Sequence, residues 1–117
     1  MFDELNGLQV TREHIKAGQR WSDTACPIAL AMKGVVEGTP KVYPKETVIH
    51  NDPITTWIHN TPELANWISR FDQGGYAYGP APITLEVTED GLLGIKQPPP
   101  NTPGPYQAAL GWWNGRR

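Results

Sequence analysis

Hydrophobic and polar positions in the first third of the chain predict two short helices. The apolar run PIALAMK extends from Pro27 to Lys33 and is followed by Gly34. Proline is favoured at the first position of a helix and glycine just past its end, so this run predicts a helix. Its apolar side chains fall on every side, which is typical of a helix covered on most faces. Thr11 is placed to cap a second helix from Arg12 to Ala17, which Gly18 ends.

A longer amphipathic helix is predicted from Pro62 to Asp72. Thr61 is a good N-cap, and proline suits the first helical position. Gly74-Gly75 marks the end of the helix. Spacings of three and four residues give this helix one apolar stripe, formed by Leu64, Ala65, Trp67, Ile68 and Phe71. The stripe must lie on a sheet or another helix, so Trp67 is interpreted as a core residue.

Alternating and β-branched runs predict short strands separated by turn residues. The clearest is Ile83 to Val87, which Glu89-Asp90-Gly91 turns into a partner around Leu92 to Ile95. Two further runs are predicted to form a hairpin around Asn51-Asp52-Pro53. The two hairpin runs are Thr47 to His50 and Ile54 to Ile58. Two other strands are predicted at Leu8 to Val10 and at Lys41 to Tyr43. Tyr76 to Pro82 is predicted to form a loop or a sheet edge.

Together these elements predict one compact α+β domain over residues 1–96. We expect a small, mainly antiparallel sheet packed against two or three short helices. Residues 97–117 form a separate Pro-rich C-terminal arm, because QPPPNTPGP holds five prolines in nine residues and favours an extended spacer. The arm ends in YQAALGWWNGRR, which is apolar and aromatic again. Such a segment is expected to dock on this chain or a neighbour, which predicts a homo-oligomer formed through the arm.

Composition narrows the classes of function. The chain has 117 residues and a net charge of −2, so there is no positive excess to drive sequence-independent DNA binding. The sequence carries no run of 18 apolar residues and does not start like a signal peptide, so a cytosolic protein is expected. The one cysteine rules out a disulfide within the chain.

Two motifs resemble those of a family of small bacteriophage proteins. The first is Val10-Thr11-x-Glu13-His14-Ile15-x-x-Gly18, and the second is the segment CPIALA that begins at Cys26. A later Phe71-Asp72-Gln73-Gly74 pattern, followed by a final strand, extends the resemblance over roughly Leu8 to Val87. The resemblance implies a phage-encoded accessory protein in the host cytoplasm and brings no catalytic residues with it. The Pro-rich arm falls outside the similar region.

Candidate chemistry begins with Cys26, which precedes a helix N-terminus where a thiol can become nucleophilic. A small hydrolase or transferase would also need a base such as His14, His50 or His59, and no local signature ties any of them to the cysteine. A buried structural cysteine is therefore the preferred interpretation. No cofactor or metal is expected, because no pair of these residues has the close spacing of a zinc site.

The aromatic residues are more informative. Aromatic rings with arginine are how proteins hold nucleotides, and the same residue types are enriched at protein–protein interfaces. The candidate ligand or partner residues are Trp57, Tyr76, Tyr78, Trp112, Trp113, Arg116 and Arg117. We therefore expect a non-enzymatic binding protein that counters a host defence by binding a host protein or sequestering a nucleotide signal. The alternatives are the small hydrolase or transferase and a structural phage component.

Overall fold

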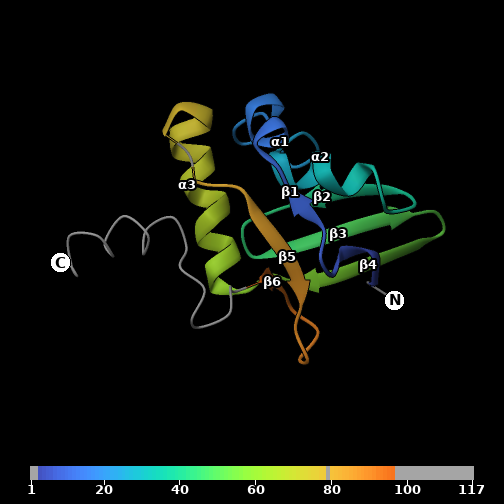
Figure 1. Ribbon diagram of the computed structural model, residues 1–117. Coiled ribbons are helices and arrows are strands. Elements are labelled where there is room, and N and C mark those ends of the chain that lie inside the picture. The colour runs from blue at the N-terminus through green and yellow to red at the C-terminus, as the bar shows by residue number, and fades with distance from the viewer. Residues whose placement is uncertain (1–2, 79, 97–117) are drawn as a thin grey trace.

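The computed structural model describes residues 3–78 and 80–96, and for residues 76–78 only the backbone. The chain runs through a 3-10 turn, six strands and three helices in this part (Figure 1). In order these are η1 Asp3–Leu5, β1 Gln9–Val10, α1 Arg12–Ala17, α2 Pro27–Lys33, β2 Thr39–Val42, β3 Glu46–Asn51, β4 Ile54–His59, α3 Pro62–Tyr78, β5 Ile83–Val87 and β6 Leu93–Ile95.

The strands form two antiparallel three-stranded sheets, ordered β1-β5-β6 and β2-β3-β4. The α+β class is confirmed, but the chain divides its strands between two sheets where the sequence predicts one. The division follows from pairing partners: β1 leaves its neighbours in sequence and pairs with β5, so that Val10 lies opposite Ile83. Beside the hairpin β3–β4, the third strand of the other sheet is β2, which pairs with β3, and β2 is an edge strand as Pro40 within it requires.

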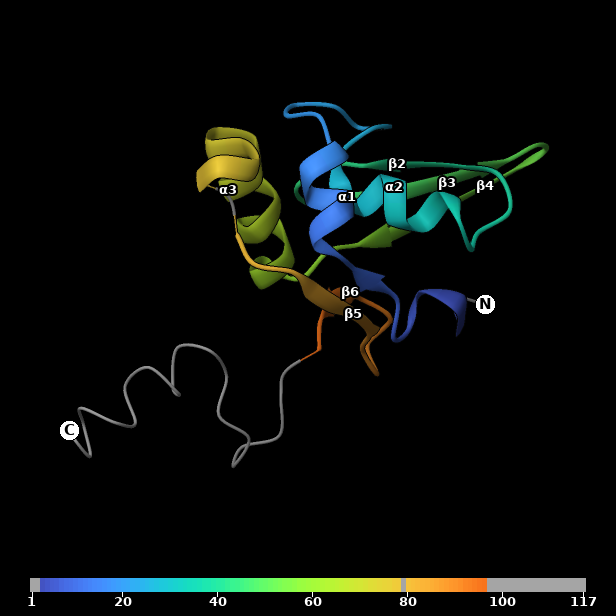
Figure 2. The ribbon, with the colours of Figure 1, turned by 45° about the horizontal axis from the view of Figure 1, so that its top comes forward.

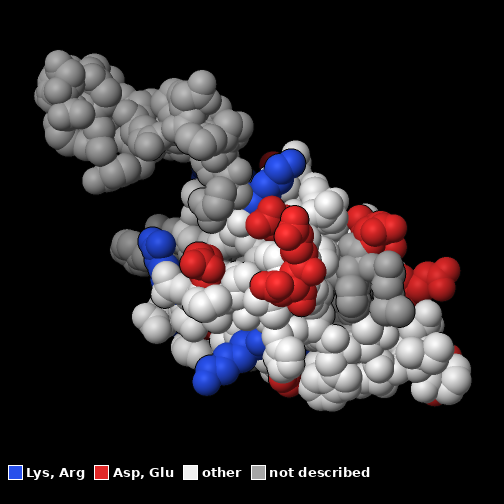
Figure 3. Space-filling model, turned by 90° about the horizontal axis from the view of Figure 1, so that it is seen from below, with Lys and Arg blue, Asp and Glu red and all other residues white. Residues whose placement is uncertain are grey.

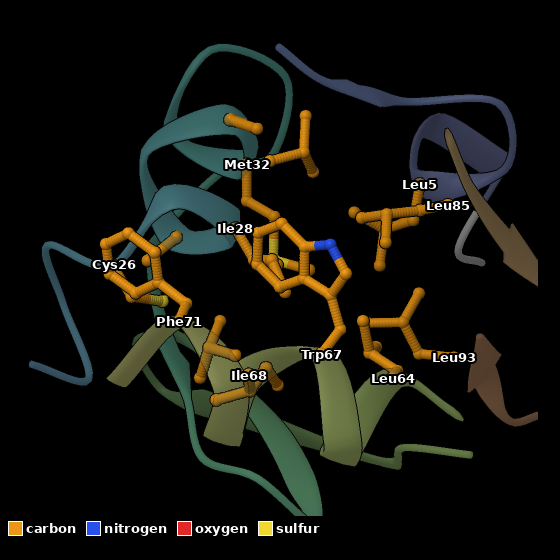
Figure 4. Packing of buried hydrophobic residues seen from close by; sticks show 14 of the residues in the cluster. Leu5, Cys26, Ile28, Met32, Leu64, Trp67, Ile68, Phe71, Leu85 and Leu93 are labelled. Carbon is orange, nitrogen blue, oxygen red and sulfur yellow. The ribbon is translucent and has the colours of Figure 1, made fainter. Parts of the chain in front are cut away.

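The helices fill the space that the two sheets leave. Figure 2 shows α1 and α2 between the sheets, with α3 at one side. Helix α2 contacts both β1 and β2, which explains why five of its seven residues are buried. The core is therefore built from all layers of the fold (Figure 4). Among its labelled members are Leu5, Ile28, Met32, Leu64, Trp67, Ile68, Phe71, Leu85 and Leu93.

Local sequence signals explain where the first helix begins. The hydroxyl oxygen of Thr11 accepts a hydrogen bond from the backbone N–H of His14 at 3.3 Å. In return, the Thr11 N–H donates to Nδ1 of His14 at 3.0 Å. This reciprocal capping box satisfies two donors that would otherwise lack partners at the helix start. His14 therefore has a structural role in α1.

The end of α3 differs from the sequence prediction. The regular helix breaks at Gly75, whose backbone has φ 64° and ψ −159°, and helical backbone then resumes as far as Tyr78. The prediction of a loop or sheet edge beginning at Tyr76 is therefore wrong for residues 76–78. Glycine adopts positive φ at little cost, so it permits a change of direction without ending the helical backbone for good.

Candidate binding cleft

A cleft of about 340 Å³ opens where the segment between α1 and α2 crosses the end of α3 and the edge of β2. Two features of its lining stand out, the pair of aromatic rings and the pair of carboxylates. The described lining residues are Trp21, Ser22, Asp23, Cys26, Val42, Tyr43, Pro44, Ile68 and Asp72. We call this feature the Trp21 cleft.

The segment 18–26 is tied to both of its neighbours by hydrogen bonds. The backbone N–H of Val42 donates to the carbonyl of Asp23 at 2.8 Å, which holds the segment on β2. On α3, the guanidinium of Arg20 donates to the carbonyl oxygens of Asp72 and Gln73. Those carbonyls lie in the last turn before the Gly75 break, where a helix leaves acceptors without partners. The guanidinium of Arg20 thus serves as a cap for the helix.

Trp21 is the most unusual residue of the cleft. It is the one described non-glycine residue with positive φ, at 60°, and its side chain is 70% exposed. The left-handed conformation costs an L-residue roughly 1–2 kcal/mol, and an exposed side chain recovers little of this by burial. Strained backbone of this kind clusters at functional sites.

Asp72 is the buried carboxylate of the cleft. It is only 6% exposed, and its Oδ1 accepts the backbone N–H of Trp21 at 2.8 Å. Within the described chain, Oδ2 has no hydrogen-bond donor and the carboxylate has no ion-pair partner. A buried carboxylate with so few hydrogen-bond partners is unfavourable.

Asp23 and Tyr43 form the exposed rim of the cleft. The Tyr43 hydroxyl donates to Oδ2 of Asp23 at 2.9 Å. This hydrogen bond, together with desolvation and the nearby carboxylates, raises the pKa of Tyr43 above its ordinary 10.0. The phenol therefore stays protonated at neutral pH and keeps the Asp23 side chain in place. The other oxygen of Asp23 has no donor among the described residues.

Cys26 contributes to the inner wall of the cleft. Its side chain is 3% exposed, and burial raises the pKa of the thiol above 9.0, despite lowering contributions from backbone N–H groups at the start of α2. None of the described lining residues is a histidine. His50 bonds to Thr55 at 3.2 Å and His59 is exposed at the end of β4, away from the lining. The interpretation of Cys26 as a buried cysteine is confirmed.

The raised pKa of Cys26 predicts a loss of stability at alkaline pH. Because the folded thiol ionises at higher pH than the unfolded one, its contribution is complete below 9.0 and is lost as the pH rises toward the folded pKa. Tyr43 acts in the same direction from 10.0 upward. Urea unfolding at pH about 7 and at pH above 9 should show a smaller decline for Cys26→Ala than for the parent chain. Equal declines would contradict this account.

Of the candidate residues chosen from the sequence, Trp57 is the one whose side chain the structure describes. It is 60% exposed and lies opposite Val48 on the face of the β2-β3-β4 sheet that points away from the core. Side chains that lie directly opposite each other on one face of a strand pair are close enough to touch. Val48 is buried on this face, beside Trp57. Trp57 does not line the Trp21 cleft.

The other candidates lie outside what the structure describes. Tyr76 and Tyr78 belong to the helical backbone after the Gly75 break, and their side chains are outside the described set. Trp112, Trp113, Arg116 and Arg117, together with the arm over residues 97–117 and its proposed docking, fall outside the described residues.

Apart from Cys26, the described residues that line the Trp21 cleft were not candidates from the sequence. One signal was available: Trp21 is a single large aromatic in the otherwise polar segment GQRWSDTA, where no apolar periodicity calls for it. Nothing in the sequence pairs it with Asp72, which is 51 positions away. The sequence predicts Asp72 only as the end of a helix, and Tyr43 only as part of a short strand.

A second, larger and more open hollow lies over the β1-β5-β6 sheet. Its volume is about 880 Å³, and its described charged lining residues are Arg12 and Lys96.

The face of the molecule seen from below carries acidic side chains gathered near its middle, with basic ones scattered at its margins (Figure 3). Acidic side chains gathered in this way repel phosphate groups at that part of the surface.

In the part of the chain that the structure describes, no cluster of three or more histidine, cysteine, aspartate or glutamate side chains is arranged to hold a metal ion. No helix among the described residues is long and apolar enough to cross a membrane.

Comparison with protein-family models, with curated proteins and with solved structures finds no match to this chain.

Proposed function

We propose that the protein is a non-enzymatic binding protein and that the Trp21 cleft is its recognition site. The observation that carries the proposal is Trp21 itself. An aromatic side chain that is mostly exposed, on a backbone held in an unfavourable conformation, is better explained by contact with a partner than by folding. The cleft around it combines apolar walls with a few polar groups, as binding sites commonly do.

The partner is a protein rather than a nucleotide. Asp23 and Asp72 line the cleft, and no described lysine, arginine or histidine does. Carboxylates repel phosphate groups, whereas aromatic rings beside apolar walls are typical of the central part of protein–protein interfaces. The hollow bearing Arg12 and Lys96 supports the second candidate, sequestration of a nucleotide signal, because its two cations attract phosphate.

The resemblance to phage proteins supplies the biological setting of this proposal. A small phage-encoded accessory protein in the host cytoplasm would counter a host defence by occupying a host protein. The aromatic end of the arm, with Trp112 and Trp113, is proposed to join copies of the chain into a homo-oligomer.

An enzymatic role for Cys26 has less support. Burial keeps the thiol protonated at neutral pH, and a catalytic cysteine acts as the thiolate. No imidazole lies in the described lining to remove its proton.

Substitution of Trp21 by asparagine tests the proposed function. Asparagine tolerates positive φ, so we expect the free energy of unfolding to stay unchanged or to rise by up to about 1 kcal/mol. Retention of a host protein by the tagged chain should fall to background. Retention is measured by quantitative mass spectrometry of what co-purifies from host cells, and stability by thermal unfolding.

The matched control is Trp57→Asn, which removes an indole that is 60% exposed and does not line the cleft. It should keep the partner that Trp21→Asn loses. A partner retained by both variants would contradict the proposed site. Turnover of a thioester or amide substrate that disappears in Cys26→Ala would favour the enzymatic alternative instead.

A further inference from the structure

We propose that the Trp21 cleft recognises the side chain of a lysine on the partner protein. This inference rests on the proposed function and names the chemical group that the cleft accepts. The juxtaposition that supports it is a nearly buried carboxylate without an ion-pair partner, a second carboxylate at the rim, and two aromatic rings around an apolar wall.

The charge of the cleft selects a cation. Asp72 is more than nine-tenths buried and still has an oxygen without a donor in the described chain. Burying a charged carboxylate costs free energy unless a positive group pairs with it. Arg20 does not fill this role, because its guanidinium donates to backbone carbonyls of α3 and is absent from the described lining. A ligand ammonium would therefore give Asp72 the partner that it lacks.

The remaining lining suits the rest of a lysine side chain. Val42, Pro44 and Ile68 supply apolar surface for a four-carbon stem, which proteins commonly bury while its charged end stays in a polar place. Trp21 and Tyr43 supply ring faces that attract a cation. The cleft volume of about 340 Å³ exceeds what one lysine side chain needs, so neighbouring atoms of the partner also enter.

The hydrogen bonds already present favour lysine over arginine. A guanidinium binds a carboxylate best through two parallel hydrogen bonds to both oxygens. Each carboxylate of the cleft has one oxygen occupied, Asp72 by the Trp21 N–H and Asp23 by the Tyr43 hydroxyl. Each carboxylate therefore has one oxygen left to accept a hydrogen bond. The separate N–H donors of an ammonium group suit such single oxygens better than the planar guanidinium of arginine does.

The test is a titration of the full chain with Nα-acetyl-lysine methylamide, followed by NMR at the Trp21 indole N–H. That resonance is identified by its absence from the spectrum of Trp21→Asn. The norleucine analogue has a similar apolar stem without the charge, and we expect it to bind at least about tenfold more weakly, because a charge-assisted hydrogen bond would be missing. The arginine and trimethyl-lysine analogues should also bind more weakly than lysine.

Asp72→Asn is the decisive variant, because asparagine keeps the shape and still accepts the Trp21 N–H while removing the charge. It should weaken lysine binding about tenfold or more. Asp23→Asn is the second variant and should weaken binding even if Asp72→Asn proves unstable. Asp52→Asn, in the exposed β3–β4 turn, is the control and should leave binding unchanged.

The outcomes separate this inference from the proposed function. Equal binding of the lysine and norleucine analogues, or no shift of the Trp21 resonance with lysine, overturns the inference. If Trp21→Asn still loses the host partner in that case, the proposed function stands with a different ligand group. Tighter binding of the arginine analogue also overturns the choice of lysine.

Discussion

Replacing Phe71 by alanine is expected to lower the free energy of unfolding by about 3–5 kcal/mol. Phe71 is 1% exposed and is stacked on Trp67, with ring centroids 6.3 Å apart and planes 9° from parallel. Figure 4 shows the ring reaching from α3 toward Cys26 and Ile28 on the α2 side of the core. Its removal leaves a cavity in the core, and the expected loss is large beside a typical net stability of about 5–15 kcal/mol.

Urea unfolding followed by circular dichroism measures this change. The matched control is Arg70→Ala, one position earlier on the same helix, where the side chain is exposed. That substitution should alter the free energy of unfolding by no more than about 0.5 kcal/mol. A Phe71→Ala variant as stable as the Arg70→Ala variant would mean that Phe71 is not packed in the core as described.

Replacing Gly38 by alanine is expected to cost about 2–5 kcal/mol, because two penalties act together. Gly38 has φ 98°, which is unfavourable for any residue with a Cβ. An added Cβ would also collide with the carbonyl oxygen of His50 and lie 2.9 Å from the Cβ of Asn51. These atoms belong to β3, whose pairing with β2 begins at Thr39 opposite His50. The entry into the β2-β3-β4 sheet must therefore shift.

The matched control is Gly91→Ala in the β5–β6 turn. Gly91 has a similar φ of 82°, but an added Cβ meets nothing within 4 Å. Only the conformational penalty then applies, about 1–2 kcal/mol. Thermal and urea unfolding of the two variants compare them directly. Equal losses would show that the close approach of Gly38 to β3 does not contribute to stability.

Most of the secondary structure was predictable because its signals are local. Helices α1 and α2 occupy the predicted residues, since a cap, a first-position proline and a following glycine act within a few positions of one another. The β3–β4 hairpin and the β5–β6 turn are also confirmed. Helix α3 continued past its predicted end because Gly75 changes direction without stopping the helical backbone.

The candidate site was not predictable in the same way. Trp57, chosen from the sequence as a candidate contact residue, is 60% exposed, and its part in binding stays a prediction. The Trp21 cleft depends on a hydrogen bond between Trp21 and Asp72, which lie 51 positions apart. No periodicity or motif records such a contact, because it arises from how α3 meets the segment between α1 and α2.

The amino-acid sequence by itself determined the two short helices, the start of α3, the approximate positions of the strands and the burial of Cys26, since each follows from propensity, capping or apolar spacing over a short stretch of chain. Only the tertiary structure decided that the strands form two sheets, that α2 lies between them, and that an exposed tryptophan stands beside a buried aspartate. The physical reason is that strand pairing and the environment of a charge depend on which distant segments meet, and local preferences leave that choice to packing.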